Sequence, residues 1–165
     1  STFLKLLFGL LIPTSGKIIS NFPESFEKSI AFQNPVFLNR SVEENLKHIL
    51  YCKTMNKSTW DILINSHLEK YNLMHLKNKM IDELSGGELQ LISLLRSILI
   101  KPDILFYDEP SNNLDDYHLD FIIDIINELR LKNTYIIIVS HDDTLATKID
   151  HDEIILDKGK IKCTN

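Results

Sequence analysis

Cysteine and glycine are scarce in this sequence of 165 residues, and basic residues are fewer than acidic ones. The two cysteines, Cys52 and Cys163, are too few for a disulfide framework and lack the spacing of a metal site. Acidic residues outnumber basic ones by 23 to 18, and the net charge of −5 argues against a nucleic-acid binder. No apolar run approaches the ~20 residues of a membrane-spanning helix. The hydrophobic share of 44% is ordinary for one folded domain, which excludes intrinsic disorder.

The sequence opens with Ser1-Thr2 and an apolar segment over residues 3–12. This segment is too short to span a membrane, and it has neither the basic leader nor the cleavage site of a signal peptide. We expect a buried helix that stops at Pro13. Ser1 and Thr2 can serve as a simple helix N-cap or as the last two positions of a phosphate-binding loop, G-x-x-x-x-G-K-[ST] plus one residue, and the sequence does not decide between them.

Strand-like and helix-like segments alternate along the rest of the chain. Short apolar runs rich in β-branched or aromatic residues predict the strands, and apolar residues at helical spacing predict the helices. The alternation predicts an α/β fold with a mostly parallel sheet flanked by helices on both faces. Strands are expected at 17–20, 29–32, 104–107, 135–139 and 153–156, and helices at 41–50, from 58, from 85 to Pro102 and at 117–131.

Polar side chains follow three of the predicted strands. Gln33 follows the strand at 29–32, Asp108 and Glu109 follow the strand at 104–107, and His141 follows the strand at 135–139. Because the carboxyl ends of parallel strands meet at one edge, where ligands bind, we predict that these side chains share a cleft. There Asp108 could hold Mg²⁺ and Glu109 could deprotonate a water. The alternative is an acidic turn and a structural histidine, both common after strands.

Two of the five glycines are adjacent, in the segment Leu84-Ser85-Gly86-Gly87-Glu88. Ser85 and Glu88 have the spacing of a capping box, which predicts a helix start. The box does not account for the glycines, since a glycine in a helix costs roughly 1 kcal/mol relative to alanine. Adjacent glycines at a helix start favour the close approach of an anion to the main-chain N–H groups.

In this order, the motifs resemble the nucleotide-binding domain of ABC-type ATPases over essentially the whole chain. The segment 84–88 is similar to the family's signature sequence, although Glu88 replaces the commoner Gln and Leu91 stands where Arg is usual. Residues 104–109 are similar to the Walker B strand, 111–115 to the D-loop, Gln33 to the Q-loop glutamine and His141 to the switch histidine. Ser1-Thr2 falls where the Walker A loop ends, so the sequence resembles a domain cut inside that loop.

The resemblance implies a P-loop NTPase-like architecture in two parts. Residues 1–40 and 101–165 would form a RecA-like ATPase core that lacks its N-terminal strands and most of Walker A, and residues 41–100 would form a helical subdomain. Since the strand before Walker A would lie within the sheet, we expect apolar strand edges to be left unpaired and the chain to aggregate or need a partner.

The resemblance also implies ATP and Mg²⁺ as cofactors and a role for each motif. Mg²⁺ would be held by Ser1, Gln33 and Asp108, and Thr2 would touch phosphate. Glu109 would be the general base, His141 would contact the γ-phosphate, and Gln33 would sense the attacking water. ATP held by the opposite subunit would be contacted by Ser85, Gly86, Gly87 and Glu88, and Asp115 would couple the two sites.

The function that the resemblance implies is the ATP-hydrolysing subunit of a membrane transporter. It would lie peripherally at the cytoplasmic face of the cell membrane, bound to a transmembrane permease subunit, to a second nucleotide-binding domain and, in an uptake system, to a substrate-binding protein. Residues 32–42 are similar to the Q-loop region of tungstate and molybdate importers, which favours uptake of a small solute or oxyanion. The alternatives are a nucleotide-incompetent fragment or regulatory subunit, and a soluble non-transport ABC ATPase.

Overall fold

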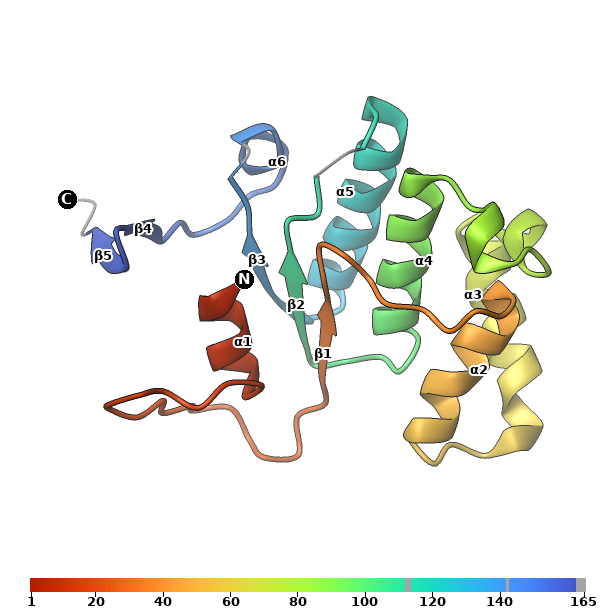
Figure 1. Cartoon of the computed structure of the whole chain (residues 1–165), viewed down its shortest axis with the longest axis horizontal. Helices are drawn as coiled ribbons and strands as arrows, with labels where there is room; N and C mark the ends of the chain where they lie inside the picture. The colour runs from red at the N-terminus through yellow and green to blue at the C-terminus, as the bar shows by residue number, and fades with distance from the viewer. Residues whose placement is uncertain (112–113, 142, 163–165) are drawn as a thin grey trace.

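Strand β2 (Ile104–Asp108) lies at the centre of a three-stranded parallel sheet in the computed structural model, which describes residues 1–111, 114–141 and 143–162. It pairs with β1 (Lys28–Ala31) on one side and with β3 (Tyr135–Val139) on the other. All five residues of β2 are buried, as expected for a strand covered on both faces. The predicted parallel α/β sheet is therefore confirmed for these strands (Figure 1).

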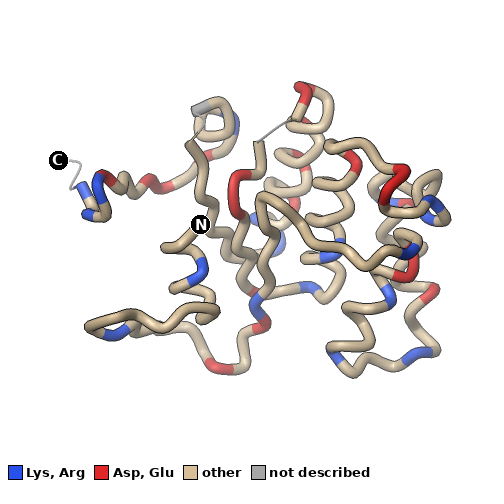
Figure 2. Tube along the Cα trace, in the orientation of Figure 1, with Lys and Arg blue, Asp and Glu red and all other residues tan. Residues whose placement is uncertain are grey.

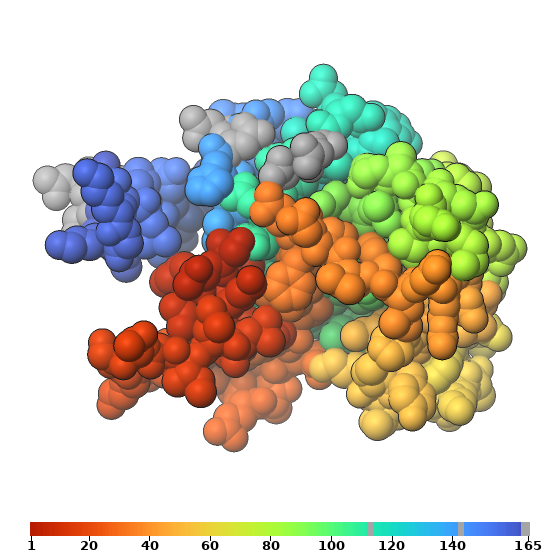
Figure 3. Space-filling model, in the orientation of Figure 1, coloured from red at the N-terminus to blue at the C-terminus, as the bar shows by residue number. Residues whose placement is uncertain are grey.

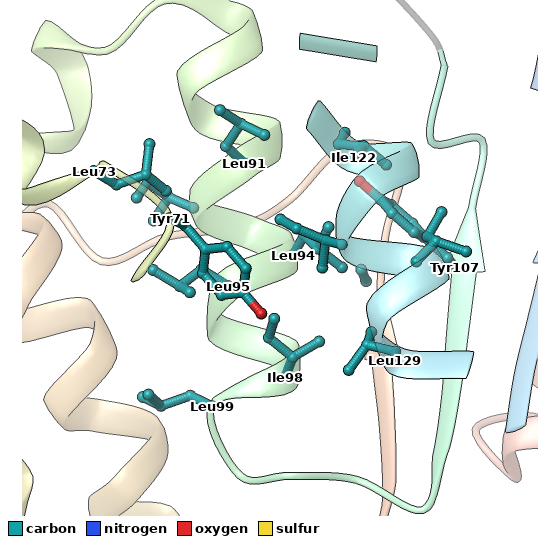
Figure 4. Packing of buried hydrophobic residues seen from close by; sticks show 14 of the residues in the cluster. Tyr71, Leu73, Leu91, Leu94, Leu95, Ile98, Leu99, Tyr107, Ile122 and Leu129 are labelled. Carbon is teal, nitrogen blue, oxygen red and sulfur yellow. The ribbon is translucent and has the colours of Figure 1, made fainter. Parts of the chain in front are cut away.

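Helices cover both faces of this sheet, and the side chains of β2 alternate between them. On one face, Ile104 and Phe106 pack with Leu4 of the short helix α1 (Thr2–Phe8). On the other face, Leu105 and Tyr107 belong to the large core that α4 (Gly86–Ile98) and α5 (Asp116–Leu131) complete. Figure 4 shows how Leu94 of α4 and Ile122 of α5 meet Tyr107 between the helices and the sheet.

A helical region follows β1 and packs against the outer side of α4 (Figure 1). Its first helix begins at the predicted capping box, in which Ser41 and Glu44 each accept from the other's main-chain N–H. The helix predicted from Ser58 instead begins at Trp60, because Asn56 caps a 3-10 turn just before it. The elements are α2 (Val42–Cys52), η1 (Lys57–Thr59), α3 (Trp60–Lys70), η2 (Met74–Leu76) and η3 (Ile81–Glu83).

The strand predicted at 153–156 does not join the parallel sheet. After α6 (Asp143–Lys148), the chain forms an antiparallel hairpin of β4 (Ile155–Asp157) and β5 (Lys160–Lys162), which projects from the main body (Figures 1 and 3). Lys158 and Gly159 both have positive φ, which is the backbone of a two-residue hairpin turn and reverses the chain. Cys163 lies outside the described residues.

Two expectations for the first 20 residues are wrong. The helix predicted at 3–12 ends at Phe8, because Gly9 takes a left-handed conformation that terminates it, and only Leu4 in α1 is buried. Residues 17–20 form no strand, since the structure gives this exposed segment no neighbouring strand to pair with. No helix in the described part of the chain is long and apolar enough to cross a membrane.

Candidate functional site

The carboxyl ends of β2 and β3 bring Asp108, Glu109 and His141 to one edge of the sheet, which we call the carboxyl edge. Asp108 is paired in register with Val139, and the main-chain N–H of Glu109 donates to the Val139 carbonyl at 2.8 Å. Glu109 has a φ of 51°, in the left-handed region that costs a non-glycine residue about 1 kcal/mol or more. The sheet ladder therefore holds Glu109 in a conformation that turns the chain sharply out of β2.

Glu109 and His141 are in direct contact across the two strand ends. The Glu109 Oε2 accepts from the main-chain N–H of His141 at 3.1 Å, and its Oε1 lies 3.2 Å from the His141 Nε2. The Glu109 side chain is only 9% exposed, whereas that of His141 is 92% exposed. The carboxylate is thus fixed at the sheet, while the imidazole is open to a ligand. Asp142, the next residue of this motif, lies outside the described residues.

Ser1 and Asp108 meet at the same edge, 107 positions apart in the sequence. The Ser1 hydroxyl donates to the Asp108 Oδ2 at 2.6 Å and does not cap α1, although Ser1 occupies the N-cap position. The Asp108 Oδ1 is buried and accepts no hydrogen bond from the residues that the structure describes, although the amino group of Ser1 forms an ion pair with it at 3.4 Å. Thr2 begins α1 and is exposed.

A buried carboxylate oxygen without a hydrogen-bond donor suits a cation ligand. Among the described residues, no group of three or more His, Cys, Asp and Glu side chains forms a metal-binding cluster. A cation at this edge would therefore rely on one carboxylate, a hydroxyl and the ligand's own oxygens, which is the donor set that Mg²⁺ uses with phosphates.

Gln33 lies two residues beyond β1, at the predicted edge of the sheet. Its main-chain carbonyl accepts a hydrogen bond of 2.6 Å from Nε2 of Gln90 in α4. In the part of the chain that the structure describes, its side chain forms no hydrogen bond with Asp108, Glu109 or His141. The structure thus places Gln33 beside the site without bringing its amide onto the carboxylates.

Two side chains that the motifs did not single out hold the linker 33–40, which joins β1 to α2. The Nη1 of Arg96 donates to the Val36 carbonyl at 2.8 Å, and its guanidinium lies 4.4 Å from the centre of the Phe37 ring. The Asn45 amide accepts from the Leu38 N–H at 2.9 Å and donates to the Leu38 carbonyl at 3.1 Å. In the sequence, Arg96 and Asn45 are marked only as polar side chains on the otherwise apolar faces of their helices.

The signature segment, residues 84–88, begins α4 with the predicted capping box. The Glu88 N–H donates to the Ser85 hydroxyl at 3.2 Å, and the Ser85 N–H donates to the Glu88 carboxylate at 2.7 Å. This second bond, with the Ser85 hydroxyl and Lys79, holds the pKa of Glu88 below its usual value. Leu91, where the family usually has Arg, is buried in the core shown in Figure 4.

The two glycines of the signature segment differ in their surroundings. A Cβ at Gly86 would meet no atom within 4 Å, so its main chain is open to a ligand. A Cβ at Gly87 would lie 2.8 Å from ring atoms of His118 in α5. His118 therefore supplies a packing requirement for Gly87 that the sequence pattern did not reveal.

Asp115 caps α5 at the same end of the molecule. Its Oδ1 accepts from the His118 N–H at 2.9 Å and lies 2.6 Å from the His118 Nδ1. The His118 main-chain N–H, with the imidazole, holds the pKa of Asp115 below its usual value. Figure 2 shows the acidic positions at the end of β2 and at the start of α5. Asn112 and Asn113, in the predicted D-loop, lie outside the described residues.

A parallel α/β sheet that gathers carboxylates, a hydroxyl and an imidazole at its carboxyl edge belongs to the class of open α/β proteins that bind their ligands at this edge. The family model described as ABC transporter matches residues 1–112. The chain belongs to this family.

Curated relatives agree with the family match. The chain is 35% identical over 164 residues to the lipoprotein-releasing system ATP-binding protein LolD of Buchnera aphidicola, covering 90% of this chain and 72% of that protein. It is 31% identical to the Fe(3+) ions import ATP-binding protein FbpC of Mannheimia succiniciproducens, covering 98% and 48%. It is 33% identical to the molybdate/tungstate import ATP-binding protein WtpC of Methanocaldococcus jannaschii, covering 86% and 50%. The chain thus spans about half the length of the two import proteins.

Solved structures confirm the fold. An inward-facing putative metal-chelate type ABC transporter superposes with a TM-score of 0.82 at 23% identity, covering 98% of this chain and 66% of that one. The cbiO1 protein of Clostridium perfringens, part of the ABC transporter complex cbiONQ, also gives 0.82 at 22% identity, covering 98% and 70%. The predicted P-loop NTPase-like class is therefore confirmed. Family membership identifies this chain as part of an ABC-type ATP-binding protein.

Proposed function

We propose that this protein is the ATP-binding and ATP-hydrolysing subunit of an ABC transporter that powers uptake of a small solute or oxyanion across a membrane. The observation that carries the proposal is the carboxyl edge, where Glu109 and His141 lie 3.2 Å apart beside the buried Asp108. Relatives named for the import of Fe(3+) and of molybdate/tungstate support uptake. The LolD relative is named for lipoprotein release, so the relatives do not share one cargo.

Phosphoryl transfer depends on positioning and charge stabilisation far more than on covalent chemistry by the protein. Glu109 is the group at this edge that can accept a proton from an attacking water, since it is ionisable and fixed by the His141 N–H. His141 is exposed beside it and can donate a hydrogen bond to a terminal phosphate oxygen. We assign Glu109 as the general base and His141 as the contact to the γ-phosphate.

The residues at this edge fit Mg²⁺, because the Ser1 hydroxyl lies against the buried Asp108 carboxylate and the Oδ1 of Asp108 accepts no hydrogen bond from any described residue. Ser1 and Asp108 would hold the ion, with the Gln33 amide as a further oxygen donor. When bound, Mg²⁺ supplies neutralisation of the phosphate charge. Thr2, next to Ser1, would contact phosphate.

A second group of residues lies at the starts of α4 and α5. Ser85, Gly86, Gly87 and Glu88 offer a capped helix start with the Gly86 main chain open, and Asp115 caps the neighbouring helix. We assign this surface to ATP held by a second nucleotide-binding domain, so that two domains close around the nucleotides in an ATP-driven dimer. Residues 1–40 and 101–165 would then act as the ATPase core and 41–100 as the helical subdomain.

The remaining partners follow from transport. The subunit would bind a transmembrane permease at the cytoplasmic face of the membrane, and an uptake system would add a substrate-binding protein. Relatives named as parts of import systems support this assembly. We assign no nucleic-acid partner, in keeping with the net charge of −5.

The test is Glu109→Gln in the assembled transporter. Removing a general base is expected to lower ATP turnover by about 10²–10⁴-fold. The matched control is Glu24→Gln, since Glu24 is exposed and precedes β1 at the opposite edge of the sheet. Unchanged turnover in Glu109→Gln would overturn the general-base assignment, and absence of ATP hydrolysis in the wild-type transporter would overturn the proposed function itself.

A further inference from the structure

The imidazole of His118 lies between the start of α4 and the start of α5. On the α4 side, it occupies the space that a side chain at Gly87 would need: a Cβ there would lie 2.8 Å from the His118 Cγ and Nδ1 and 2.9 Å from its Cδ2. Real Cβ atoms essentially never approach other atoms so closely, so a side chain at position 87 would force the His118 ring or the main chain to shift. The neighbouring Gly86 faces no such contact.

On the α5 side, the same ring is fixed by a hydrogen bond. The His118 Nδ1 lies 2.6 Å from the Asp115 Oδ1, which also accepts from the His118 main-chain N–H at 2.9 Å. An ionised carboxylate only accepts hydrogen bonds, so the Nδ1 carries the proton and donates. The His118 side chain is 19% exposed and that of Asp115 is 65% exposed. The ring is therefore largely enclosed, while the Asp115 carboxylate faces outward.

We propose that His118 is a positioning residue that fixes the signature glycine Gly87 relative to Asp115. One ring makes both contacts, so the start of α4 and the cap of α5 are held as one surface. The inference rests on the proposed function, in which this surface meets ATP bound to a second nucleotide-binding domain. In this arrangement His118 acts through Gly87 and Asp115, the two residues that its ring faces.

The contact with Gly87 is tested by a double-mutant cycle on urea unfolding. Gly87→Ala is expected to lower the unfolding midpoint in the wild-type background, and most of this loss is expected to disappear in a His118→Ala background, where the space is free. Gly86→Ala is the matched control and is expected to shift the midpoint equally in both backgrounds. Equal effects of Gly87→Ala in the two backgrounds would overturn the proposed contact.

The positioning role is tested by the ATP concentration that gives half-maximal turnover, which a change in stability alone does not alter. In the assembled transporter, His118→Ala is expected to raise the ATP concentration for half-maximal turnover by at least about fivefold, the lower end of typical coupling between sites. Binding of ATP to the separate, undimerised subunit is expected to be unchanged, because the carboxyl edge is untouched. His118→Asn, which keeps a donor near Asp115, is expected to recover part of the loss.

These outcomes separate the inference from the function on which it rests. Wild-type hydrolysis with an unchanged half-maximal concentration in His118→Ala would overturn the positioning role and leave the proposed function standing. An equal loss of ATP binding by the separate subunit would also overturn it, because His118 would then act on the nucleotide of its own domain. Absence of hydrolysis by the wild-type transporter would instead remove the proposed function.

Discussion

Gln90, near the start of α4, donates a 2.6 Å hydrogen bond from its Nε2 to the main-chain carbonyl of Gln33. The bond ties the helix that carries the signature segment to the linker 33–40. The other end of the same amide, Oε1, is buried without a hydrogen-bond partner among the described residues. The position of the Gln90 side chain therefore satisfies its Nε2 donor and not its Oε1 acceptor, and we expect the linker to depend on this hydrogen bond.

Replacing this donor should increase local opening of the linker 33–40 more than it lowers the free energy of unfolding of the whole protein. In Gln90→Met, loss of one hydrogen bond of about 1 kcal/mol should speed amide hydrogen exchange by about fivefold at Leu38, whose N–H donates to Asn45. Removal of the unpaired Oε1 offsets part of the cost to global stability. Glu69→Met, on an exposed position of α3, serves as the control. Exchange rates equal to those of the wild type would show that the linker does not depend on Gln90.

Arg96 is the second anchor of the linker, through the Val36 carbonyl and the Phe37 ring. Burial lowers the pKa of its guanidinium. Arg96→Met should reduce the free energy of unfolding by about 1–3 kcal/mol, since a charged donor and a cation–π contact are both lost. Urea titration measures the change. Arg96→Lys should recover little of the lost free energy of unfolding. A lysine ammonium cannot stack a planar face on the Phe37 ring while it donates to the Val36 carbonyl. Full recovery by Lys would contradict this explanation.

Tyr107 carries a buried hydroxyl with no hydrogen-bond partner among the described residues, and burial raises its pKa. Tyr107→Phe removes this unsatisfied group and keeps the ring that packs between β2 and the helices in Figure 4. The free energy of unfolding should rise by about 1 kcal/mol, as measured by urea titration. Tyr117→Phe, at an exposed position of α5, should have no effect. A loss of stability in Tyr107→Phe would mean that the hydroxyl has a partner.

Glu88 should make the stability of the protein depend on pH. The Ser85 N–H lowers the folded-state pKa of Glu88, so its contribution is present above the unfolded pKa of about 4.3 and is lost as the pH falls through the folded pKa. Glu88→Gln keeps an acceptor for Ser85 without the charge. Wild type should therefore be the more stable at pH 7, by a fraction of a kcal/mol, and the difference should shrink below about pH 4. A constant difference across this range in urea titrations would exclude the assignment.

Local signals predicted the elements that local chemistry controls. The capping boxes at Ser41 and Ser85 lie within three residues of their partners, and each begins a helix as expected. The run at 104–107 is a buried strand and the run at 135–139 is a strand that is half-buried after the exposed Tyr135. Their ends bring Asp108, Glu109 and His141 to one edge as the βαβ pattern predicted.

The failures and omissions concern contacts that depend on the whole fold. The apolar run at 17–20 resembles a strand but has no neighbour to pair with, and the run at 153–156 is turned into a hairpin by Lys158 and Gly159. Gln90, Arg96 and His118 were missed as site-supporting residues because their partners lie 57, 60 and 31 positions away, at Gln33, Val36 and Gly87. Helical and strand periodicities relate residues only a few positions apart, so they do not predict these long-range contacts.

Helix α4 contributes buried side chains to the sheet side and to the helical side of one continuous core. Leu46 and Leu68 on one side and Leu105 and Ile122 on the other belong to the same buried cluster, with Leu95 of α4 among them. The two proposed parts, divided at residues 40 and 101, therefore share buried packing. Heating the protein should accordingly melt the sheet and the helical region together in one cooperative transition, and two separate transitions would contradict this expectation.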